Sequence, residues 1–436
     1  MTTTAAQFPI TLDTIAGLSI AELAEQFGTP FYAYDAAKIV ERIDDLAPFD
    51  VVRFAQKACS NLAILAWVRK HGVVVDAVSA GEVRRALAAG YDATEPMPGQ
   101  PGTRQIVYTA DLFDREALDL VVEHDLPVNC GSPQMIDQYG ERCQALGRER
   151  GVTLRINPGF GHGHSQKTNT GGEQSKHGIW HEQVADCVER AAKWGLSIEG
   201  LHMHIGSGTD LEHLGQVCGA MEKIALEVGP SVHSISAGGG LPTPYRDGDA
   251  RVEIAGYHKL WDATRDRLAE AFGHAVSLEI EPGRYLTAES GSLVAEVRTV
   301  KQMGSNLYYL VDAGFNNLAR PILYGSYHPM AICHTDPAHA AGGEQDAIVG
   351  GPLCESGDIF TQEEGGFVSA RRLPHAEVGD LLVIGCAGAY GYVMSSNYNS
   401  KPMAPEVMIV GGKAELIRER QTFEDIVRGE NVPQWD

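Results

Sequence analysis

The sequence predicts an α/β barrel of the TIM type followed by an all-β domain, an antiparallel β-sandwich or β-barrel. Between about residues 36 and 284, short apolar strands alternate with helical patterns, which is typical of a parallel sheet covered by helices. After about residue 285 the long helical patterns stop, and short alternating segments between turn residues favour antiparallel strands. The length of 436 residues suits two domains.

The first 31 residues form a lead-in that we expect to pack on the β domain. Residues 20–27 predict a short amphipathic helix, which ends at Gly28 and Pro30. The segment that begins at Phe31 is strand-like. The expected divisions are residues 1–31 for the lead-in, 32–284 for the barrel and 285–436 for the β domain.

Eight apolar segments are candidate barrel strands: residues 51–55, 73–78, 105–109, 127–129, 153–156, 199–204, 232–236 and 275–280. Helical patterns lie between most of them, at residues 81–89, 115–123, 134–146, 180–193 and 257–272. Eight such units in about 240 residues suit a TIM-type barrel. A doubly wound parallel sheet is the alternative. In the β domain, strands are expected at residues 292–300, 307–311 and 380–384, and a helix at 422–427.

The predicted barrel strands end in reactive residues. In a TIM barrel the chemistry lies at the C-terminal ends of the strands. Those ends carry ionisable groups and glycines: Lys57, Asp76, Asn129, Arg155, His204, Gly238 to Gly240, and Glu281. Lys57 follows the first strand directly. Because a lysine is costly to bury, this position indicates a Schiff-base or general-base lysine, or else a surface lysine that happens to follow a strand.

Composition excludes several classes of partner. The formal charge is −22, with 57 acidic against 35 basic residues, which argues against nucleic acid and anionic membranes. The eight cysteines form no CxxC pair and suggest neither a disulfide framework nor a zinc site. A reducing cytoplasm is therefore expected. We see no signal peptide and no apolar run of membrane-spanning length.

Two motifs could bind an anion such as phosphate. Residues 236–241 (SAGGGL) follow a strand, and consecutive glycine N–H groups can cradle a phosphate. This run lacks the full dinucleotide fingerprint, and a tight turn is the alternative. In Glu281-Pro-Gly-Arg284, the proline fixes a turn, the glycine allows close approach and the arginine can grip an anion. The alternative is a surface salt-bridge turn.

Histidines accompany these motifs. His202 and His204 alternate on one strand and share a face, which would suit a metal pair or a ring stacked on a planar cofactor. The later strand ends hold glycines and Glu281 instead of further metal ligands, so no metal is expected. We interpret His162, His164, His177 and His181 as parts of a glycine-rich loop near the site.

The β domain carries its own candidate residues. Cys354 stands beside Glu355 in a loop, where a thiol could donate a proton or lie buried and inert. Arg320 and Tyr324 share one short segment, and Tyr390 lies in a glycine-lined turn. Lysine, phosphate-binding glycines, a stacking histidine and a carboxylate for a pyridine nitrogen are together the parts of a pyridoxal phosphate (PLP) site.

A set of motifs between residues 54 and 400 resembles one family: FAQKACSN, NPGFGHGHSQKTNTGGEQSKHGIW, HMHIGSG, SAGGGL, EIEPGR, GPLCESGD and GAYGYVMSSNYNS. The chain resembles the diaminopimelate decarboxylases, in the fold-type III class of PLP enzymes that also holds ornithine decarboxylase and alanine racemase. The resemblance implies PLP-dependent decarboxylation of meso-2,6-diaminopimelate to L-lysine and CO2, the last step of lysine biosynthesis.

The resemblance also implies residue roles. Lys57 would form the Schiff base with PLP, with Asp76 nearby, His204 stacked on the ring and Glu281 at the pyridine nitrogen. The phosphate end or its approaches would be surrounded by Ser207, Gly240, Pro282, Gly283 and Arg284, and Tyr390 would contact both PLP and substrate. Arg284, Arg320 and Tyr324 would hold the distal carboxylate of the substrate, and Glu355 its distal ammonium. Cys354 would donate the proton after CO2 leaves.

In this family Cys354 and Glu355 come from the partner subunit, so the resemblance implies a head-to-tail homodimer with shared active sites. Three other functions stay open at this point. An ornithine or arginine decarboxylase differs in substrate recognition, which depends on Arg320, Tyr324 and Glu355. A racemase would place an arginine at the pyridine nitrogen, where this chain has Glu281. A non-catalytic PLP protein would be a single barrel or would lack the lysine.

Overall fold

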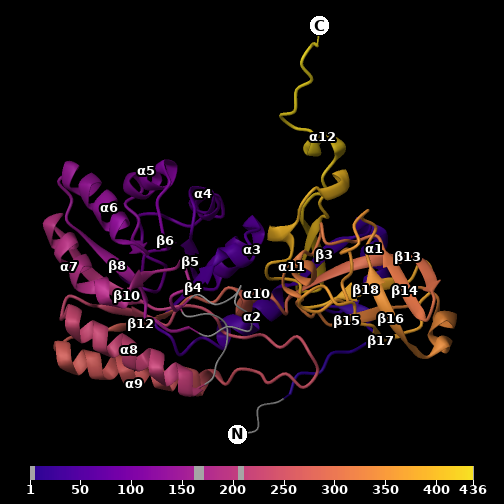
Figure 1. Ribbon diagram of the computed structural model, residues 1–436, viewed down its shortest axis with the longest axis horizontal. Coiled ribbons are helices and arrows are strands. Elements are labelled where there is room, and N and C mark those ends of the chain that lie inside the picture. The colour runs from indigo at the N-terminus through magenta and orange to yellow at the C-terminus, as the bar shows by residue number, and fades with distance from the viewer. Residues whose placement is uncertain (1–4, 162–170, 205–210, 436) are drawn as a thin grey trace. The chain divides into compact units, whose positions relative to one another are not determined.

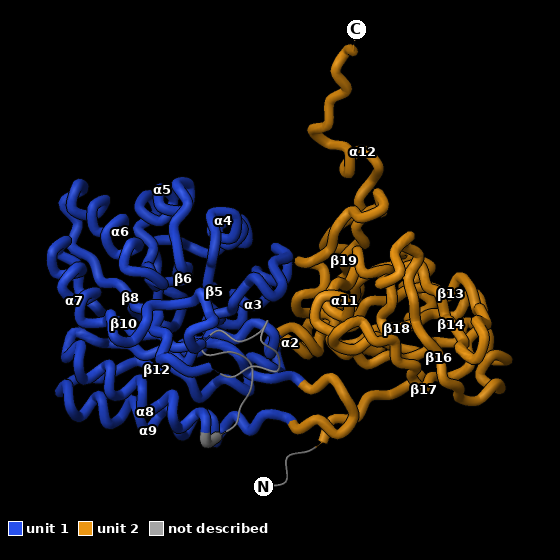
Figure 2. Tube along the Cα trace, viewed as in Figure 1, with its two compact units in different colours: residues 1–3, 40–243, 251–286 blue, residues 4–39, 244–250, 287–436 orange. Residues whose placement is uncertain are grey.

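The computed structural model describes residues 5–161, 171–204 and 211–435, which fall into two compact units (Figure 2). Residues 40–243 and 251–286 belong to the first unit. Residues 5–39, 244–250 and 287–435 belong to the second. The chain passes from the second unit into the first along helix α2 (Ala36–Asp44).

The first unit is a closed parallel barrel. Its strands are β4 (Val51–Ala55), β5 (Val74–Ala77), β6 (Ile106–Ala110), β7 (Val128–Cys130), β8 (Arg150–Asn157), β10 (Leu196–His202), β11 (Ser234–Ser236) and β12 (Ser277–Ile280). Each strand pairs in parallel with the next, and the pairing of β12 with β4 closes the ring. The short β9 (Ile179–Trp180) adds to β8. The predicted TIM-type barrel is confirmed, because a doubly wound sheet would have two free edges.

Helices cover the outside of this barrel (Figure 1): α3 (Leu62–Lys70), α4 (Ala80–Ala88), α5 (Arg115–Glu123), α6 (Pro133–Ala145), α7 (Val184–Lys193), α8 (Leu211–Val228) and α9 (Ile254–Phe272). Several begin at a side-chain cap. Ser79 Oγ accepts the Glu82 N–H at 3.2 Å, and Asp114 Oδ1 accepts the Ala117 N–H at 2.7 Å. Such caps typically stabilise a helix by about 1 kcal/mol.

The second unit is built on a mixed sheet. Its main path runs β17 (Arg371–Pro374), β16 (Glu344–Gly350), β14 (Asn306–Val311), β13 (Gly291–Met303), β3 (Phe31–Asp35), β19 (Glu406–Val410) and β20 (Lys413–Arg418). Strand β18 (Leu381–Ile384) pairs with β13 and with β15 (Met330–Cys333). Most pairs are antiparallel, as predicted. The pairs β14–β16 and β3–β19 are parallel, so the sheet is mixed.

The expected boundary at residue 32 is placed too early. Strand β3 lies between β13 and β19, so the chain up to Ile39 belongs to the second unit. Helix α1 (Ile20–Phe27) contributes Ile20 and Leu23 to the core of that unit. The short segment 244–250 also belongs to it. A strand-like segment read alone does not reveal its pairing partner, which is why the sequence misplaces the boundary.

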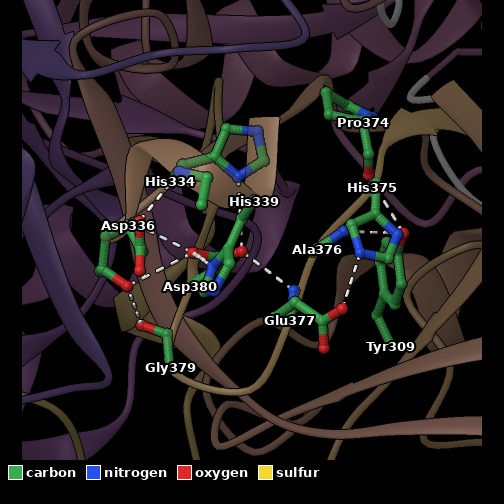
Figure 3. Close-up of polar contacts among 12 residues, drawn as sticks. Tyr309, His334, Asp336, His339, Pro374, His375, Ala376, Glu377, Gly379 and Asp380 are labelled. Carbon is green, nitrogen blue, oxygen red and sulfur yellow. Dashed lines mark hydrogen bonds and ion pairs between the residues drawn. The ribbon is translucent and has the colours of Figure 1, made fainter. Parts of the chain in front are cut away.

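Asp380 organises the turn that precedes β18 (Figure 3). Its carboxylate is fully buried and accepts the N–H groups of Thr335 and Glu377, each at 2.9 Å. The ring of His339 places Nδ1 2.9 Å from the same carboxylate, and His334 lies at 3.4 Å. Burial by itself would raise the pKa of Asp380, but these donors lower it.

The described residues also form three short helices, α10 (Arg284–Thr287), α11 (Arg320–Tyr324) and α12 (Phe423–Ile426), and a hairpin of β1 (Thr14–Ile15) with β2 (Leu18–Ser19). All eight cysteines are free thiols, and Cys354 is the exposed one. Within the residues described, no helix combines the length and the apolar character needed to cross a membrane.

Candidate active site

Lys57 lies at the C-terminal end of β4. It is in a single 3-10 turn, Gln56–Ala58, that follows the strand at once. Gln56 is buried, and its amide donates to the backbone oxygens of Asp76 at 3.4 Å and Glu82 at 3.2 Å. The turn is thereby fixed while the Lys57 side chain is exposed. The amine is thus presented at the barrel end rather than buried inside it.

Glu281 is held as a buried anion just after β12. His202 Nε2 lies 2.8 Å from Glu281 Oε2, and Ser236 Oγ donates to Oε1 at 3.0 Å. Burial alone would raise the pKa of Glu281, but His202, Ser236 and Arg53 outweigh burial and lower it to about 2. The carboxylate is therefore ionised at any physiological pH.

Asp76 behaves in the opposite way. It occupies β5 beside Ala55 of β4 and is buried. Burial, and then the negative charge of Glu281, raise the pKa of Asp76 far above its ordinary value, and Lys57 opposes that rise. The two carboxylates, which lie on either side of β4, therefore do not share their charge equally. Glu281 keeps the negative charge because His202 and Ser236 solvate it.

His204 and the glycine run form one backbone-lined surface. The N–H of Gly239 donates to His204 Nδ1 at 2.9 Å. Burial and the charges of Arg155 and Lys57 lower the pKa of His204 well below its ordinary value. The ring is therefore neutral, with its proton on Nε2. A Cβ on Gly239 would lie 2.6 Å from the backbone oxygen of Glu281, so only glycine fits between the strand ends.

The residues after Glu281 turn back onto β4. The carbonyl of Pro282 accepts the Ala55 N–H at 3.0 Å. A Cβ on Gly283 would come within 3.2 Å of Ala58, and Arg284 begins α10. Gly240 has a left-handed φ of 95°. Lys57, Asp76, His204, Gly240 and the 281–284 segment thus lie at the same end of the barrel strands.

Three of the predicted residues cannot be placed, whereas His177 can. Ser207, His162 and His164 lie outside the described residues. His177 places Nδ1 2.5 Å from Asp111 Oδ2, while a neighbouring N–H donates to the other oxygen. His177 therefore ties its end of the loop to the end of β6.

In the second unit, Arg320 opens α11 and is buried. Its guanidinium donates to the Tyr245 hydroxyl and to His328 Nε2, each at 3.0 Å, and to Ser326 Oγ at 3.3 Å. His328 Nδ1 lies 3.0 Å from the Gly385 carbonyl, which fixes its tautomer with the proton on Nδ1. Tyr324, on the same short helix, is half-buried. The described contacts fix the orientation of the Arg320 fork.

Cys354 and Glu355 lie in an exposed loop of the same unit. The Cys354 N–H donates to Asn399 Oδ1 at 2.8 Å, and the Tyr398 hydroxyl lies 3.4 Å from Glu355. Asp358 closes the loop by accepting the Leu353 N–H at 2.8 Å. A Cβ on Gly357 would meet Ile322 of α11 at 2.9 Å, so this loop packs against the helix that carries Arg320.

Tyr390 stands in the turn after β18 with a left-handed φ of 55°. Such backbone is uncommon for a tyrosine and is often found at functional sites. The sequence did not predict the supporting contacts: His202 and Ser236 belonged to candidate motifs but were not expected to hold Glu281, and Tyr245 and His328 were not candidates. The register that pairs His202 with Ser236 would have placed both beside Glu281.

Comparisons with known proteins identify the family of the chain. Residues 36–288 match the family model described as pyridoxal-dependent decarboxylase, pyridoxal binding domain. The chain is 52% identical to the diaminopimelate decarboxylase of Streptomyces coelicolor, over 96% of this chain and 92% of that protein. The enzyme of Escherichia coli K12 is also 52% identical, over 94% and 95%. The chain belongs to the diaminopimelate decarboxylase family.

The chain is also similar in structure to solved members of this family. A crystal structure of diaminopimelate decarboxylase has a TM-score of 0.87 and 51% identity, and the match covers 94% of this chain and 95% of that one. The structure of a diaminopimelate decarboxylase from M. jannaschii in complex with L-lysine has a TM-score of 0.84 at 27% identity, over 96% and 95%.

The residues present fit PLP. The backbone-lined surface at Gly239 has no room for a side chain, as close approach of a phosphate requires. Glu281 supplies the anion that a protonated pyridine nitrogen needs, and His204 a neutral ring. Lys57 presents an exposed amine at the same barrel end.

Proposed function

We propose that the chain catalyses the PLP-dependent decarboxylation of meso-2,6-diaminopimelate to L-lysine and CO2. Identity of 52% over nearly the whole length of two decarboxylases supports this activity. The observation that carries it is the ionised Glu281, held by His202 and Ser236 at the barrel end that carries Lys57. A racemase would place a cation at that position.

The bound PLP would supply a protonated ring that withdraws the electron pair left by departing CO2. The residues of the chain set up that chemistry. Glu281 keeps the ring nitrogen protonated because its own pKa is far below neutral pH. Lys57 holds the cofactor, His204 supports the ring face, and the glycines of 238–240 with Gly283 surround the phosphate.

We propose that Arg320 selects the substrate by binding its distal carboxylate. A guanidinium fork matches a carboxylate in two parallel hydrogen bonds, and Tyr245, His328 and Ser326 orient it before the substrate arrives. Arg284 and Tyr324 assist at the same carboxylate, and Glu355 pairs with the distal ammonium. Tyr390 contacts both cofactor and substrate.

We further propose a head-to-tail homodimer in which Cys354 and Glu355 of one subunit complete the site of the other. Cys354 would donate the proton that replaces CO2. Its exposed thiol supports this assignment, since the other seven cysteines are buried. Free thiols also support a cytoplasmic location.

The test is release of CO2 from purified protein given meso-diaminopimelate, with ornithine and lysine as comparison substrates. We expect L-lysine from diaminopimelate and barely any turnover of the other two. Equal turnover of ornithine would move the chain to the diamine-forming decarboxylases. Lys57→Ala should remove the borohydride-reducible link to PLP, whereas Lys70→Ala should retain it. A link that persists on another residue of Lys57→Ala would show that Lys57 is not the attachment point.

A further inference from the structure

Two arginines of the second unit stack on one tyrosine ring. The guanidinium carbon of Arg371, at the start of β17, lies 3.7 Å from the centre of the Tyr327 ring. That of Arg246 lies 4.3 Å from the same centre. The two guanidinium carbons are therefore at most 8.0 Å apart, a distance at which their charges still repel. Cation–π contact with the ring offsets part of that repulsion.

Neither guanidinium forms an ion pair with any residue that the structure describes. Three carboxylates line the same cavity: Asp247, Glu344 and Glu363. Glu363 acts on Arg371 through its charge without forming an ion pair with it, and the other two have other partners. Asp247 accepts the Phe8 N–H at 2.7 Å, and Glu344 lies 3.5 Å from Arg372. Arg371 donates to the His328 carbonyl, a neutral acceptor. Two close cations that form no ion pair are a costly arrangement, which a bound anion would relieve.

Burial disfavours the charged form of Arg371. Burial and then the charge of Arg246 lower the pKa of Arg371 to about 10, although Tyr327 and Glu363 oppose the fall. Arg371 is still charged at neutral pH, so the positive charge is present but poorly solvated. Such a group gains more from an anion than an exposed arginine does, because less water has to be displaced.

The cavity in front of these arginines has a volume of about 430 Å³ and is lined by polar groups such as Ser369 and Gln362. This volume holds a small oxyanion together with water. The cavity lies apart from the Arg320 cluster although the same two chain segments build both. Tyr245 and His328 contact Arg320, whereas their chain neighbours Arg246 and Tyr327 face the cavity.

We propose that Arg246 and Arg371 form a second anion-binding site, separate from the substrate carboxylate site at Arg320, that takes a small phosphate or carboxylate. Planar guanidinium forks bind both groups in two parallel hydrogen bonds. A free phosphate ion and the carboxylate of a small metabolite share this chemistry. The proposal does not depend on which reaction the enzyme catalyses.

The test is calorimetric titration of the PLP-loaded enzyme with inorganic phosphate, in a Tris chloride buffer of constant ionic strength. Bound PLP occupies the cofactor phosphate site, so phosphate should report the new site. Succinate in a parallel titration separates a carboxylate preference from a phosphate preference. We expect the unmodified protein to bind at least one of the two, at one site per chain.

Arg246→Gln should weaken that binding at least tenfold, and Arg298→Gln should leave it unchanged. Arg298 is a matched control because it is an exposed arginine of the same unit, paired with Glu296. Arg371→Lys keeps the charge but loses the stacked fork, so it should also weaken binding while the protein stays folded. Absence of binding by the unmodified protein, or equal binding by Arg246→Gln and Arg371→Lys, would overturn the proposal.

Discussion

At the scale of single residues, the site depends on how two carboxylates divide their charge. Glu281 and Asp76 lie at the ends of β12 and β5, on either side of β4, and burial disfavours the charge on both. His202 and Ser236 contact Glu281, and their contribution decides which of the two stays ionised. His202 can therefore act on the site through the charge of Glu281.

His202→Gln should raise the pKa of Glu281, because burial would no longer be offset by the imidazole. In the unmodified enzyme the pKa of Glu281 lies near 2, so its protonation does not limit activity at mildly acidic pH. In the variant the low-pH limb of kcat/KM should move up by at least one pH unit. His233→Gln, at the other end of the barrel strands, is the control. An unshifted limb would show that His202 does not set the charge of Glu281.

Arg320→Leu should damage activity on diaminopimelate and leave PLP bound. Loss of a buried charge pair with the distal carboxylate typically costs about 2–5 kcal/mol, which is tens- to thousands-fold in kcat/KM. The cofactor absorbance and the kinetics of the same preparation check both parts. Arg298→Leu is the matched control. Unchanged kcat/KM in Arg320→Leu would remove Arg320 from substrate recognition.

At the scale of elements, the sequence predicted the barrel well and the second unit less well. Each barrel strand is a short apolar run between helices, so pattern alone located all eight, and residues 115–123 coincide with α5. Strand β3 was found but assigned to the wrong unit, because its partners β13 and β19 lie more than 250 residues away. Helix α11 was missed because it spans only Arg320–Tyr324, too short for a periodic pattern.

The candidate site was likewise predictable only in part. Residues at strand ends were predictable because the barrel brings all those ends together. Supporting contacts such as His202 with Glu281 depend on strand register, which the pattern does not fix. The partners of Arg320 were harder to predict, because Tyr245 and His328 come from separate loops.

Asp380→Asn tests an element-scale interaction, the turn before β18 (Figure 3). An amide has one acceptor oxygen, so one of the buried N–H groups of Thr335 and Glu377 would lose its partner. We expect a loss of about 2–4 kcal/mol in the free energy of unfolding, measured by denaturant titration. Asp346→Asn, which changes an exposed side chain, should cost little.

The loss should depend on pH in a defined way. The lowered pKa of Asp380 means that its stabilisation is present above the unfolded value of about 4 and is lost as pH falls through the folded value. The raised pKa of His339 gives a contribution that is full below about 6.5 and is lost as pH rises through the folded value. The difference between the two proteins should therefore be largest between about pH 4 and 6.5. A difference that is constant with pH would contradict this account.

At the scale of the whole molecule, the candidate site residues are divided between the two compact units. The barrel supplies Lys57, His204 and Glu281, and the second unit supplies Arg320, Cys354 and Tyr390. Cys354 is exposed on its own unit, in a loop fixed by Asn399 and Asp358. A residue that serves a second subunit has to be exposed and held in a defined position, and Cys354 meets both conditions.

Mixing two inactive variants tests that assembly. In a randomised mixture of Lys57→Ala and Cys354→Ala chains, half of the dimers contain one chain of each kind. If Cys354 serves the partner's Lys57, one of the two sites in each such dimer has both residues intact. About a quarter of the unmodified activity should then return. Each variant alone under the same exchange conditions is the control. No recovery, with subunit exchange shown by differently tagged chains, would place Lys57 and Cys354 in the site of one chain.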